Sequence, residues 1–219
     1  MRPSLCFSAP FAFIFLTAKD AKVRREIQLN NCMNNRKLIL ASASPRRQFL
    51  LKEIGLEFTI EPPHIDESFP VDMQIENVPS YLAEKKAIAL LPKITDEIII
   101  ASDTVVILGH QILNKPADRA EAIQMLTDLS GHTHTVITAV CLLSKVKSDC
   151  FEDRTEVTFK KLTKHEIEFY VDNYKPYDKA GAYGAQDWIG MVAIEKIVGS
   201  YFTVMGLPIH RVYQRLQVF

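Results

Sequence analysis

The sequence predicts a layered α/β fold, and three observations lead to this prediction. After Met33, short apolar runs typical of strands alternate with amphipathic runs typical of helices. The 219 residues suit one large domain or two small lobes with a substantial core. Apolar residues make up 47% and charged residues 24%, and this ordinary globular mixture excludes disordered and fibrous architectures.

The first half of the predicted fold opens with a strand, a tight loop and a helix. Residues 37–41 form a short apolar strand. Ser44 and Pro45 then supply the N-cap and first residue of a helix, and Gly55 supplies its stop. The elements expected next are an extended segment over 56–60, a helix over about 79–91, and an apolar run over 98–108 that is a buried strand pair or one interrupted strand.

The second half alternates helices and strands up to the last residues. An amphipathic helix is expected over 117–129, and the β-branched density of 133–143 is typical of a central strand. Thr163, followed three residues later by Glu166, has the pattern of a capping box that opens a helix. The remaining elements are a strand over about 155–159, a loop rich in Gly, Tyr and Asp, a strand over about 191–197 and a last helix after Pro208.

Charge and cysteine usage restrict the partners and the compartment. The 26 basic and 26 acidic residues cancel, which argues against a protein that grips nucleic acid through bulk charge, so phosphate recognition must be local. The four cysteines form no C-x-x-C pair, so neither a zinc ribbon nor a disulfide framework is indicated and a reducing cytoplasm fits best. No apolar run reaches the roughly 18 to 20 residues of a membrane helix, so no membrane partner is expected.

Residues 1–32 are expected to be an N-terminal extension to a domain that covers 33–219. The segment resembles a signal peptide because Arg2 precedes an apolar run, but Pro10 interrupts the run and no cleavage site is clean. The alternative, which we favour, is that translation starts at Met33, since this residue leads directly into the first convincing strand.

The segment from Ser42 to Arg47 has the features of an anion site. It follows a strand and opens a helix, so backbone N–H groups and the guanidinium groups of Arg46 and Arg47 converge on one place. An ordinary N-cap with two exposed arginines is the alternative. Against that alternative, arginine in the first turn opposes the helix dipole unless an anion is present.

Asp103 is the main candidate for a catalytic carboxylate. It lies in a polar triplet inside the apolar run over 98–108, and an ionised Asp buried without partners is costly. Such a carboxylate can hold a divalent ion or take a proton from water, whereas the structural alternative is an Asp that caps a turn between two strands. Asp66 and Glu67 could add magnesium ligands, although such a pair is typical of a solvated loop.

Other polar residues give weaker signals. Lys115 lies in a fixed turn before a helix, where it could meet a phosphate, and Lys86 could do so or could lie on a solvated helix face. His132 and His134 have the spacing of a metal pair on one strand face, but without a third ligand nearby we favour a polar strand edge. The glycine-studded loop over 178–186 suits a flat ligand whose base edge could meet an amide, or is one of two tight turns.

The order of six motifs resembles the Maf family, the septum-formation-inhibitor-like nucleoside triphosphate pyrophosphatases related to the inosine triphosphatase fold. The motifs are S-x-S-P-R-R, A-S-D-T, N-K-P, S-G-x-x-H-x-V-x-T, D-K-A-G-A-Y-G-x-Q and G-S-Y-x-x-V-M-G-L-P, and they extend from residue 37 to the last helix. The resemblance implies a mixed central β-sheet flanked by helices in two lobes, with a cleft between them.

The resemblance also implies an activity, a cofactor and roles for particular residues. Family members cut nucleoside triphosphates between the α and β phosphates with magnesium or manganese, a house-cleaning of the nucleotide pool, and D-K-A-G-A-Y-G-x-Q resembles the dTTP and UTP branch. Asp103 matches the proton acceptor, and Glu67 matches a metal ligand. The positions that match substrate choice are Arg46, Thr104 and Gln186. The positions that match the phosphate side are Ser42, Arg47, Lys86, Lys115 and Lys179.

Two departures from the family pattern and two other functions stay open. The N-terminal extension has no counterpart, and Asp187-Trp188 follows Gln186 where many members have glycine, which could alter the rim of the base pocket. A regulatory nucleotide-binding module could use the same anion site without chemistry and act on cell division through a protein partner. A hydrolase of sugar nucleotides is a third, weaker hypothesis. The oligomeric state, including a homodimer, is also left open.

Overall fold

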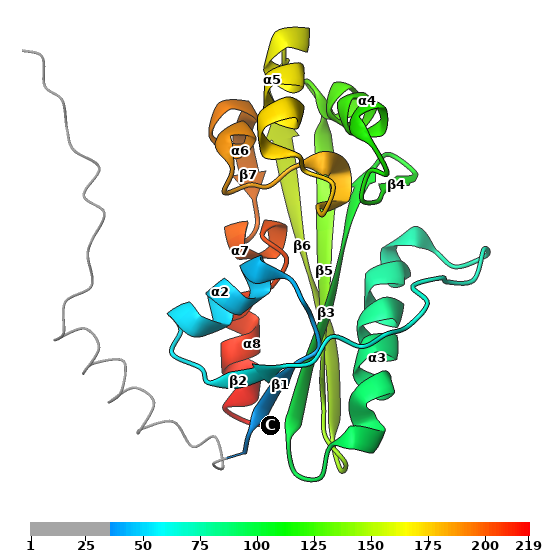
Figure 1. Ribbon diagram of the computed structural model, residues 1–219, viewed down its shortest axis with the longest axis vertical. Coiled ribbons are helices and arrows are strands. Elements are labelled where there is room, and N and C mark those ends of the chain that lie inside the picture. Colours follow the sequence, from blue (N-terminus) through cyan, green and yellow to red (C-terminus); the bar gives the residue numbers. More distant parts are fainter. Residues whose placement is uncertain (1–35) are drawn as a thin grey trace, which may run out of the picture. The chain divides into compact units, whose positions relative to one another are not determined.

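The computed structural model describes residues 36–219, so the predictions for residues 1–32 lie outside the described residues. The described part contains a mixed seven-stranded sheet with the order β2-β1-β3-β5-β6-β7, and β4 pairs with β3 (Figure 1). β1 runs parallel to β2 and β3, and the other pairs are antiparallel. The strands are β1 (Leu38–Leu40), β2 (Phe58–Ile60), β3 (Ile98–Leu108), β4 (Gln111–Leu113), β5 (Thr133–Leu143), β6 (Ser148–Phe159) and β7 (Ile194–Val198).

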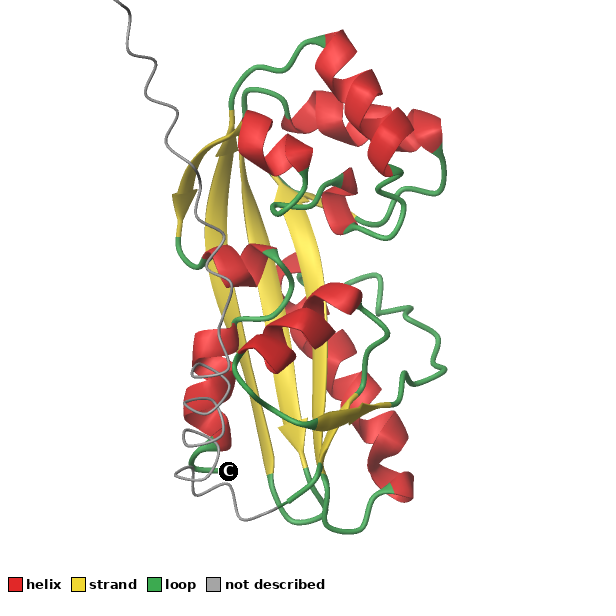
Figure 2. Cartoon of the chain, turned by 60° about the vertical axis from the view of Figure 1, so that its left-hand side comes forward, coloured by secondary structure: helices red, strands yellow, loops and turns green. Residues whose placement is uncertain are grey.

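Helices gather in two groups along this sheet (Figures 1 and 2). The first helical group is α2 (Pro45–Glu53), α3 (Val78–Leu90) and α8 (Ile209–Leu216), and the second helical group is α4 (Arg119–Leu129), α5 (Lys164–Tyr174) and α6 (Trp188–Ala193). The short α7 (Tyr201–Val204) lies between them, and single 3₁₀ turns cover Ile75–Asn77, Leu91–Lys93 and Ala180–Ala182. The predicted α/β fold with a mixed sheet and two lobes is therefore confirmed.

Alternating residues of β1 and β3 explain how the first helical group packs. Leu40 and Ile100 join a core cluster with Leu51 of α2 and Val212 of α8. Their sequence neighbours point to the other face, where Ile99 packs against α3 in a separate cluster. Because successive side chains of a strand point to opposite faces, helices cover both faces of the sheet at this end.

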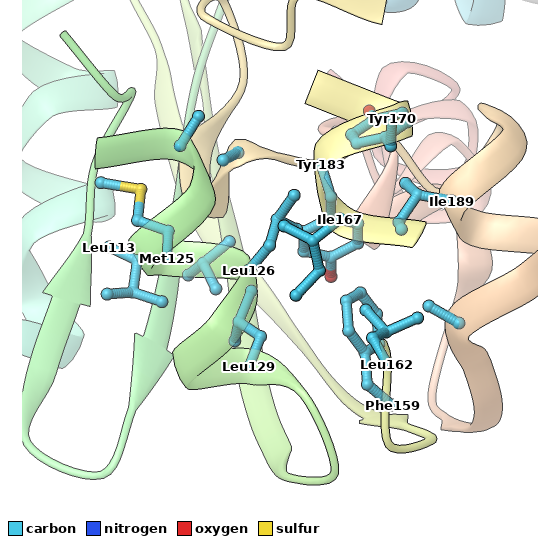
Figure 3. Packing of buried hydrophobic residues seen from close by; sticks show 14 of the residues in the cluster. Leu113, Met125, Leu126, Leu129, Phe159, Leu162, Ile167, Tyr170, Tyr183 and Ile189 are labelled. Atoms are coloured by element: carbon cyan, nitrogen blue, oxygen red, sulfur yellow. The ribbon is translucent and has the colours of Figure 1, made fainter. Parts of the chain in front are cut away.

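The second helical group closes over a larger apolar cluster. Leu126 and Leu129 of α4 meet Ile167 and Tyr170 of α5 over Phe159 of β6 (Figure 3). The predicted capping box fixes the start of α5, because Oγ1 of Thr163 accepts from the Glu166 backbone N–H and the Glu166 carboxylate accepts from the Thr163 N–H. Each reciprocal bond satisfies a backbone donor that the helix leaves free.

Two strand predictions are wrong, one in the continuity of β3 and one in the start of β7. β3 is neither a strand pair nor interrupted, since its ladder with β5 runs unbroken from Ile99 to Ile107. Polar side chains do not interrupt the backbone hydrogen bonds of a strand, so the ladder continues through Ser102, Asp103 and Thr104. The side chains of these three residues face other elements. The strand expected over 191–197 begins only at Ile194, because α6 extends to Ala193. A short apolar run does not distinguish a buried helix turn from a strand.

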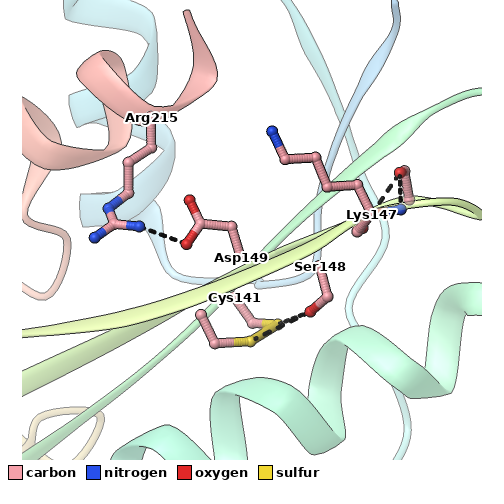
Figure 4. Close-up of a disulfide and its surroundings, with 7 residues drawn as sticks. Cys141, Lys147, Ser148, Asp149 and Arg215 are labelled. Atoms are coloured by element: carbon pink, nitrogen blue, oxygen red, sulfur yellow. Dashed lines mark hydrogen bonds and ion pairs between the residues drawn. A yellow bond between two sulfur atoms is a disulfide. The ribbon is translucent and has the colours of Figure 1, made fainter. Parts of the chain in front are cut away.

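The structure also corrects the prediction for the cysteines. Cys141 of β5 lies directly opposite Cys150 of β6 and forms a disulfide with it (Figure 4). The expectation of no disulfide depended on sequence spacing alone. Strand register brings the two residues together, and spacing carries no information about register.

His134 is not part of a polar strand edge, so that prediction is wrong too. β5 lies between β3 and β6, and only 2% of His134 is exposed. Its Nε2 hydrogen-bonds the hydroxyl of Tyr183 at 2.8 Å, and burial lowers its pKa to about 4. His132 instead meets the backbone oxygen of Asp128. The two histidines therefore have separate partners.

Candidate active site

A cleft of about 640 Å³ lies beside the central strands and is lined by α2, α3 and the loops that precede α4 and α6. This volume falls in the range of roughly 300 to 1,000 Å³ that is typical of small-molecule sites. All of the predicted site residues line it, namely Ser42, Arg46, Arg47, Glu67, Lys86, Asp103, Thr104, Lys115, Lys179 and Gln186. Residues that are far apart in the sequence, such as Arg46 and Asp103, thus face one cleft.

A buried ion pair forms one wall of the cleft. Asp103 sits in the middle of β3, and its Oδ1 accepts from Nζ of Lys86 on α3 at 2.6 Å. The same ammonium lies 3.0 Å from Oε1 of Glu67. Lys86 is 8% exposed, so the predicted alternative of a solvated helix face does not apply to it. One lysine therefore holds two carboxylates together.

Burial and charge set the protonation of this cluster. Burial raises the pKa of Asp103, and the Lys86 ammonium opposes this shift without cancelling it. Burial also pushes the pKa of Glu67 upward, but the positive charge of Lys86 and, more weakly, of Lys115 leaves it below its usual value. Asp103 is thus the better proton acceptor of the two, because its conjugate acid is the weaker acid.

The loop after β1 and the start of α2 form the opposite, positive side. The N-cap Ser44 makes no side-chain cap bond, and Pro45 follows it at the first helical position. The N–H groups of the first turn consequently have no capping side chain and can receive an anion. Ser42 accepts from the Ser44 N–H through its hydroxyl, which shapes this loop.

Arg47 connects three elements at the base of this positive side. Its Nη1 donates to Oγ of Ser42, its Nη2 to Oγ1 of Thr104 (both 3.1 Å), and its Nε to the backbone oxygen of Gly206 (2.8 Å). Burial lowers its pKa, although the charge of Asp103 acts in the opposite direction. Each of its three nitrogens is thus engaged within the protein, which makes Arg47 a brace between α2, β3 and the turn before α8.

Asp178 is a residue of this site that the sequence reasoning missed. Its Oδ2 accepts from Nη1 of Arg46 at 2.9 Å, and its Oδ1 accepts from Nζ of Lys179 at 2.7 Å. The carboxylate therefore links two cations that were assigned to the substrate. Its place directly before Lys179 in the glycine-studded loop was the available signal, but the partner Arg46 is 132 residues away.

The donor set of the cleft fits magnesium or manganese bound together with a phosphate. Glu67 and Asp103 offer two carboxylates at one place, already gathered around a cation, the Lys86 ammonium. Within residues 36–219 no group of three or more His, Cys, Asp or Glu side chains forms a closed site. Magnesium is typically held by one or two carboxylates together with substrate phosphates and water, and two carboxylates meet that requirement.

A comparison with protein-family models identifies the family. The model described as "Maf-like protein" matches residues 37–219. The chain belongs to the Maf family. Among the described residues of this Maf-family chain, no helix is long and apolar enough to cross a membrane.

Several similar proteins carry the name "dTTP/UTP pyrophosphatase". The Bacteroides fragilis protein (strain ATCC 25285) is 46% identical over 183 residues, which cover 83% of this Maf-family chain and 95% of that protein. The Cytophaga hutchinsonii protein is 44% identical over 187 residues, covering 85% and 86%. The Flavobacterium psychrophilum protein is 46% identical over 186 residues, covering 84% and 95%. The Ham1 protein of Staphylococcus aureus overlaps with a TM-score of only 0.39 and 13% identity, over 72% of this chain and 91% of that one.

Proposed function

We propose that this Maf-family chain hydrolyses dTTP and UTP between the α and β phosphates and releases the nucleoside monophosphate and pyrophosphate. The observation that carries the proposal is the buried carboxylate of Asp103, which faces an anion site across one cleft. Similar proteins named dTTP/UTP pyrophosphatase support the choice of substrate.

Asp103 acts as the general base in this proposal. Its Oδ1 is held by Lys86, whereas Oδ2 has no hydrogen-bond partner among the described residues. Oδ2 is therefore the atom that accepts a proton from the attacking water. The raised pKa of Asp103 favours this role, because a base is most effective when its pKa approaches the working pH.

The positive side of the cleft binds the triphosphate. The N-terminus of α2 with Ser42 receives phosphate oxygens, and Arg46, Lys115 and Lys179 neutralise their charge. The side chains of Arg46 and Lys179 are already directed toward an anion, because both bond the Asp178 carboxylate. They exchange this carboxylate for phosphate when substrate enters. Glu67 and Asp103 would hold a divalent cation. When bound, this cation would stabilise the negative charge that develops on the phosphates.

Pyrophosphate release tests the proposal. We expect wild-type protein with magnesium to release pyrophosphate from dTTP and UTP, and Asp103→Asn to lower kcat by about 10² to 10⁴, the range for loss of a general base. Asp72→Asn, an exposed acid, is the matched control and should keep wild-type turnover. Near-wild-type turnover of Asp103→Asn would contradict the proposed base. Tight UTP binding without any pyrophosphate would instead support the regulatory module.

The cytoplasmic location, the absence of a nucleic-acid partner and the oligomeric state, including a homodimer, stay predictions from the sequence. The same holds for the individual roles of the site residues. Substitution of each, assayed against a panel of nucleotides by kcat/KM, would test these roles.

A further inference from the structure

A series of hydrogen bonds through Asp187 connects the core of the second helical group to the cleft. Tyr170 is fully buried in that core, where Figure 3 shows it among the packed apolar side chains. Its hydroxyl donates to Oδ2 of Asp187 at 2.8 Å. Oδ1 of the same carboxylate accepts from the side-chain amide of Gln186 at 3.1 Å. Nζ of Lys179 lies 3.8 Å from Oδ2. Gln186 and Lys179 line the cleft, whereas Asp187 does not.

The lack of a side chain at Gly184 leaves room for the Asp187 carboxylate. A Cβ at Gly184 would come within 2.5 Å of Oδ2 of Asp187 and 2.8 Å of Nε2 of Gln186. The Gly184 N–H also donates to the hydroxyl of Tyr170 at 3.2 Å. Because this hydroxyl accepts from Gly184, its own proton is directed to Asp187.

The direction of each hydrogen bond fixes the orientation of the Gln186 amide. A carboxylate only accepts hydrogen bonds, so the NH₂ group of Gln186 must face Asp187 and cannot exchange places with the amide oxygen. The oxygen Oε1 of Gln186 has no hydrogen-bond partner among the described residues, and since Gln186 lines the cleft this oxygen can accept from a ligand there. An amide oxygen selects a ligand edge that carries an N–H donor.

We propose that Asp187 is a positioning residue for base recognition, which turns the carbonyl of Gln186 toward the imide N3–H of uracil or thymine. This inference rests on the proposed function and deepens it, because it names the residue that sets the hydrogen-bond pattern of the base site. Asp187 does not touch the reacting phosphates in this scheme. Its main effect is therefore expected on binding of the base, and N3-methyl-UTP, which has the same phosphates but no imide donor, controls for the 3.8 Å approach of Asp187 to Nζ of Lys179.

Asp187→Asn tests the inference with nearly unchanged side-chain volume. The Asn oxygen would keep the proton of Tyr170, so the Asn NH₂ group would face Gln186 and force its amide to turn over. The probes are UTP and N3-methyl-UTP, which lacks the imide donor. We expect Asp187→Asn to raise KM and Kd for UTP by roughly 3- to 10-fold, the net worth of one hydrogen bond, with kcat within about twofold. For N3-methyl-UTP we expect no change.

A double-mutant cycle and a second variant separate positioning from a structural role. In a Gln186→Met background, Asp187→Asn should have no further effect on UTP. Tyr170→Phe removes the buried hydrogen bond but keeps the Asp187 carboxylate, so the Gln186 amide keeps its orientation and UTP binding should change much less than in Asp187→Asn. Equal losses for UTP and N3-methyl-UTP in Asp187→Asn would overturn the inference. Absence of pyrophosphate release by wild-type protein would overturn the proposed function, while the Kd comparison would still decide the role of Asp187.

Discussion

At the scale of single residues, Lys86 determines how the acidic wall of the cleft behaves. Its ammonium lies 2.6 Å from Oδ1 of Asp103 and 3.0 Å from Oε1 of Glu67. Lys86 belongs to α3, Asp103 to β3 and Glu67 to the loop before α3. Burial raises the pKa of Asp103, and Lys86 is the first group that opposes this rise. The lysine thereby keeps a buried carboxylate available as a base.

Substitution of Lys86 should change the pH dependence of turnover. In Lys86→Gln the opposing charge is lost, so the pKa of Asp103 should rise further above its usual value. Since the ionised carboxylate is the active form, the acid limb of the kcat/KM profile should move to higher pH. Lys85→Gln is the matched control, because Lys85 bonds the backbone of Ser68 and does not bond Asp103. An unmoved acid limb in Lys86→Gln would show that Asp103 is not the titrating base.

At the scale of elements, α2 and α5 begin in different ways. α5 begins with a closed capping box, whereas the N-cap of α2 makes no side-chain bond. The first device stabilises a helix by satisfying its own donors. The second leaves donors available, which is the property that an anion site requires.

Loss of the capping box should cost stability without loss of activity. Thr163→Ala removes the oxygen that accepts from the Glu166 N–H, and we expect the free energy of unfolding to fall by about 1 kcal/mol. Urea unfolding measures this difference. Lys164→Ala, at a highly exposed position in the same turn, should change stability by much less. An equal loss in both variants would show that the capping box contributes nothing specific.

At the scale of the whole molecule, β3 and β5 connect the two helical groups. Both strands are 11 residues long and paired from Ile99 to Ile107, so each contributes side chains to the core clusters of both lobes. The cleft lies along this shared sheet and takes residues from each lobe. We therefore expect the two lobes to unfold as one cooperative unit.

A core substitution in one lobe should lower the unfolding midpoint of the other lobe as well. Leu51 is fully buried in the first helical group, and Leu51→Ala should lower the free energy of unfolding by about 2 to 5 kcal/mol. Trp188, the single tryptophan, packs against the core of the second helical group. Its fluorescence midpoint in urea should shift as far as the far-UV circular dichroism midpoint. An unshifted fluorescence transition in Leu51→Ala would mean that the lobes unfold independently. The control is Lys52→Ala, which lies on the exposed side of α2 and should leave both midpoints nearly unchanged.

Features that depend on a few neighbouring residues could be predicted from the amino-acid sequence. The start of α2 at Ser44-Pro45, the capping box of Thr163 and the anomaly of Asp103 all follow from local chemistry. The full set of residues expected at the substrate came from the resemblance to the Maf family, and these residues line the cleft. Other features could be established only from the folded chain, namely the Cys141–Cys150 pairing, the burial of His134 and the contacts of Asp178 and Asp187. Those features depend on strand register and on contacts between distant segments, which packing of the whole chain fixes and spacing along it does not.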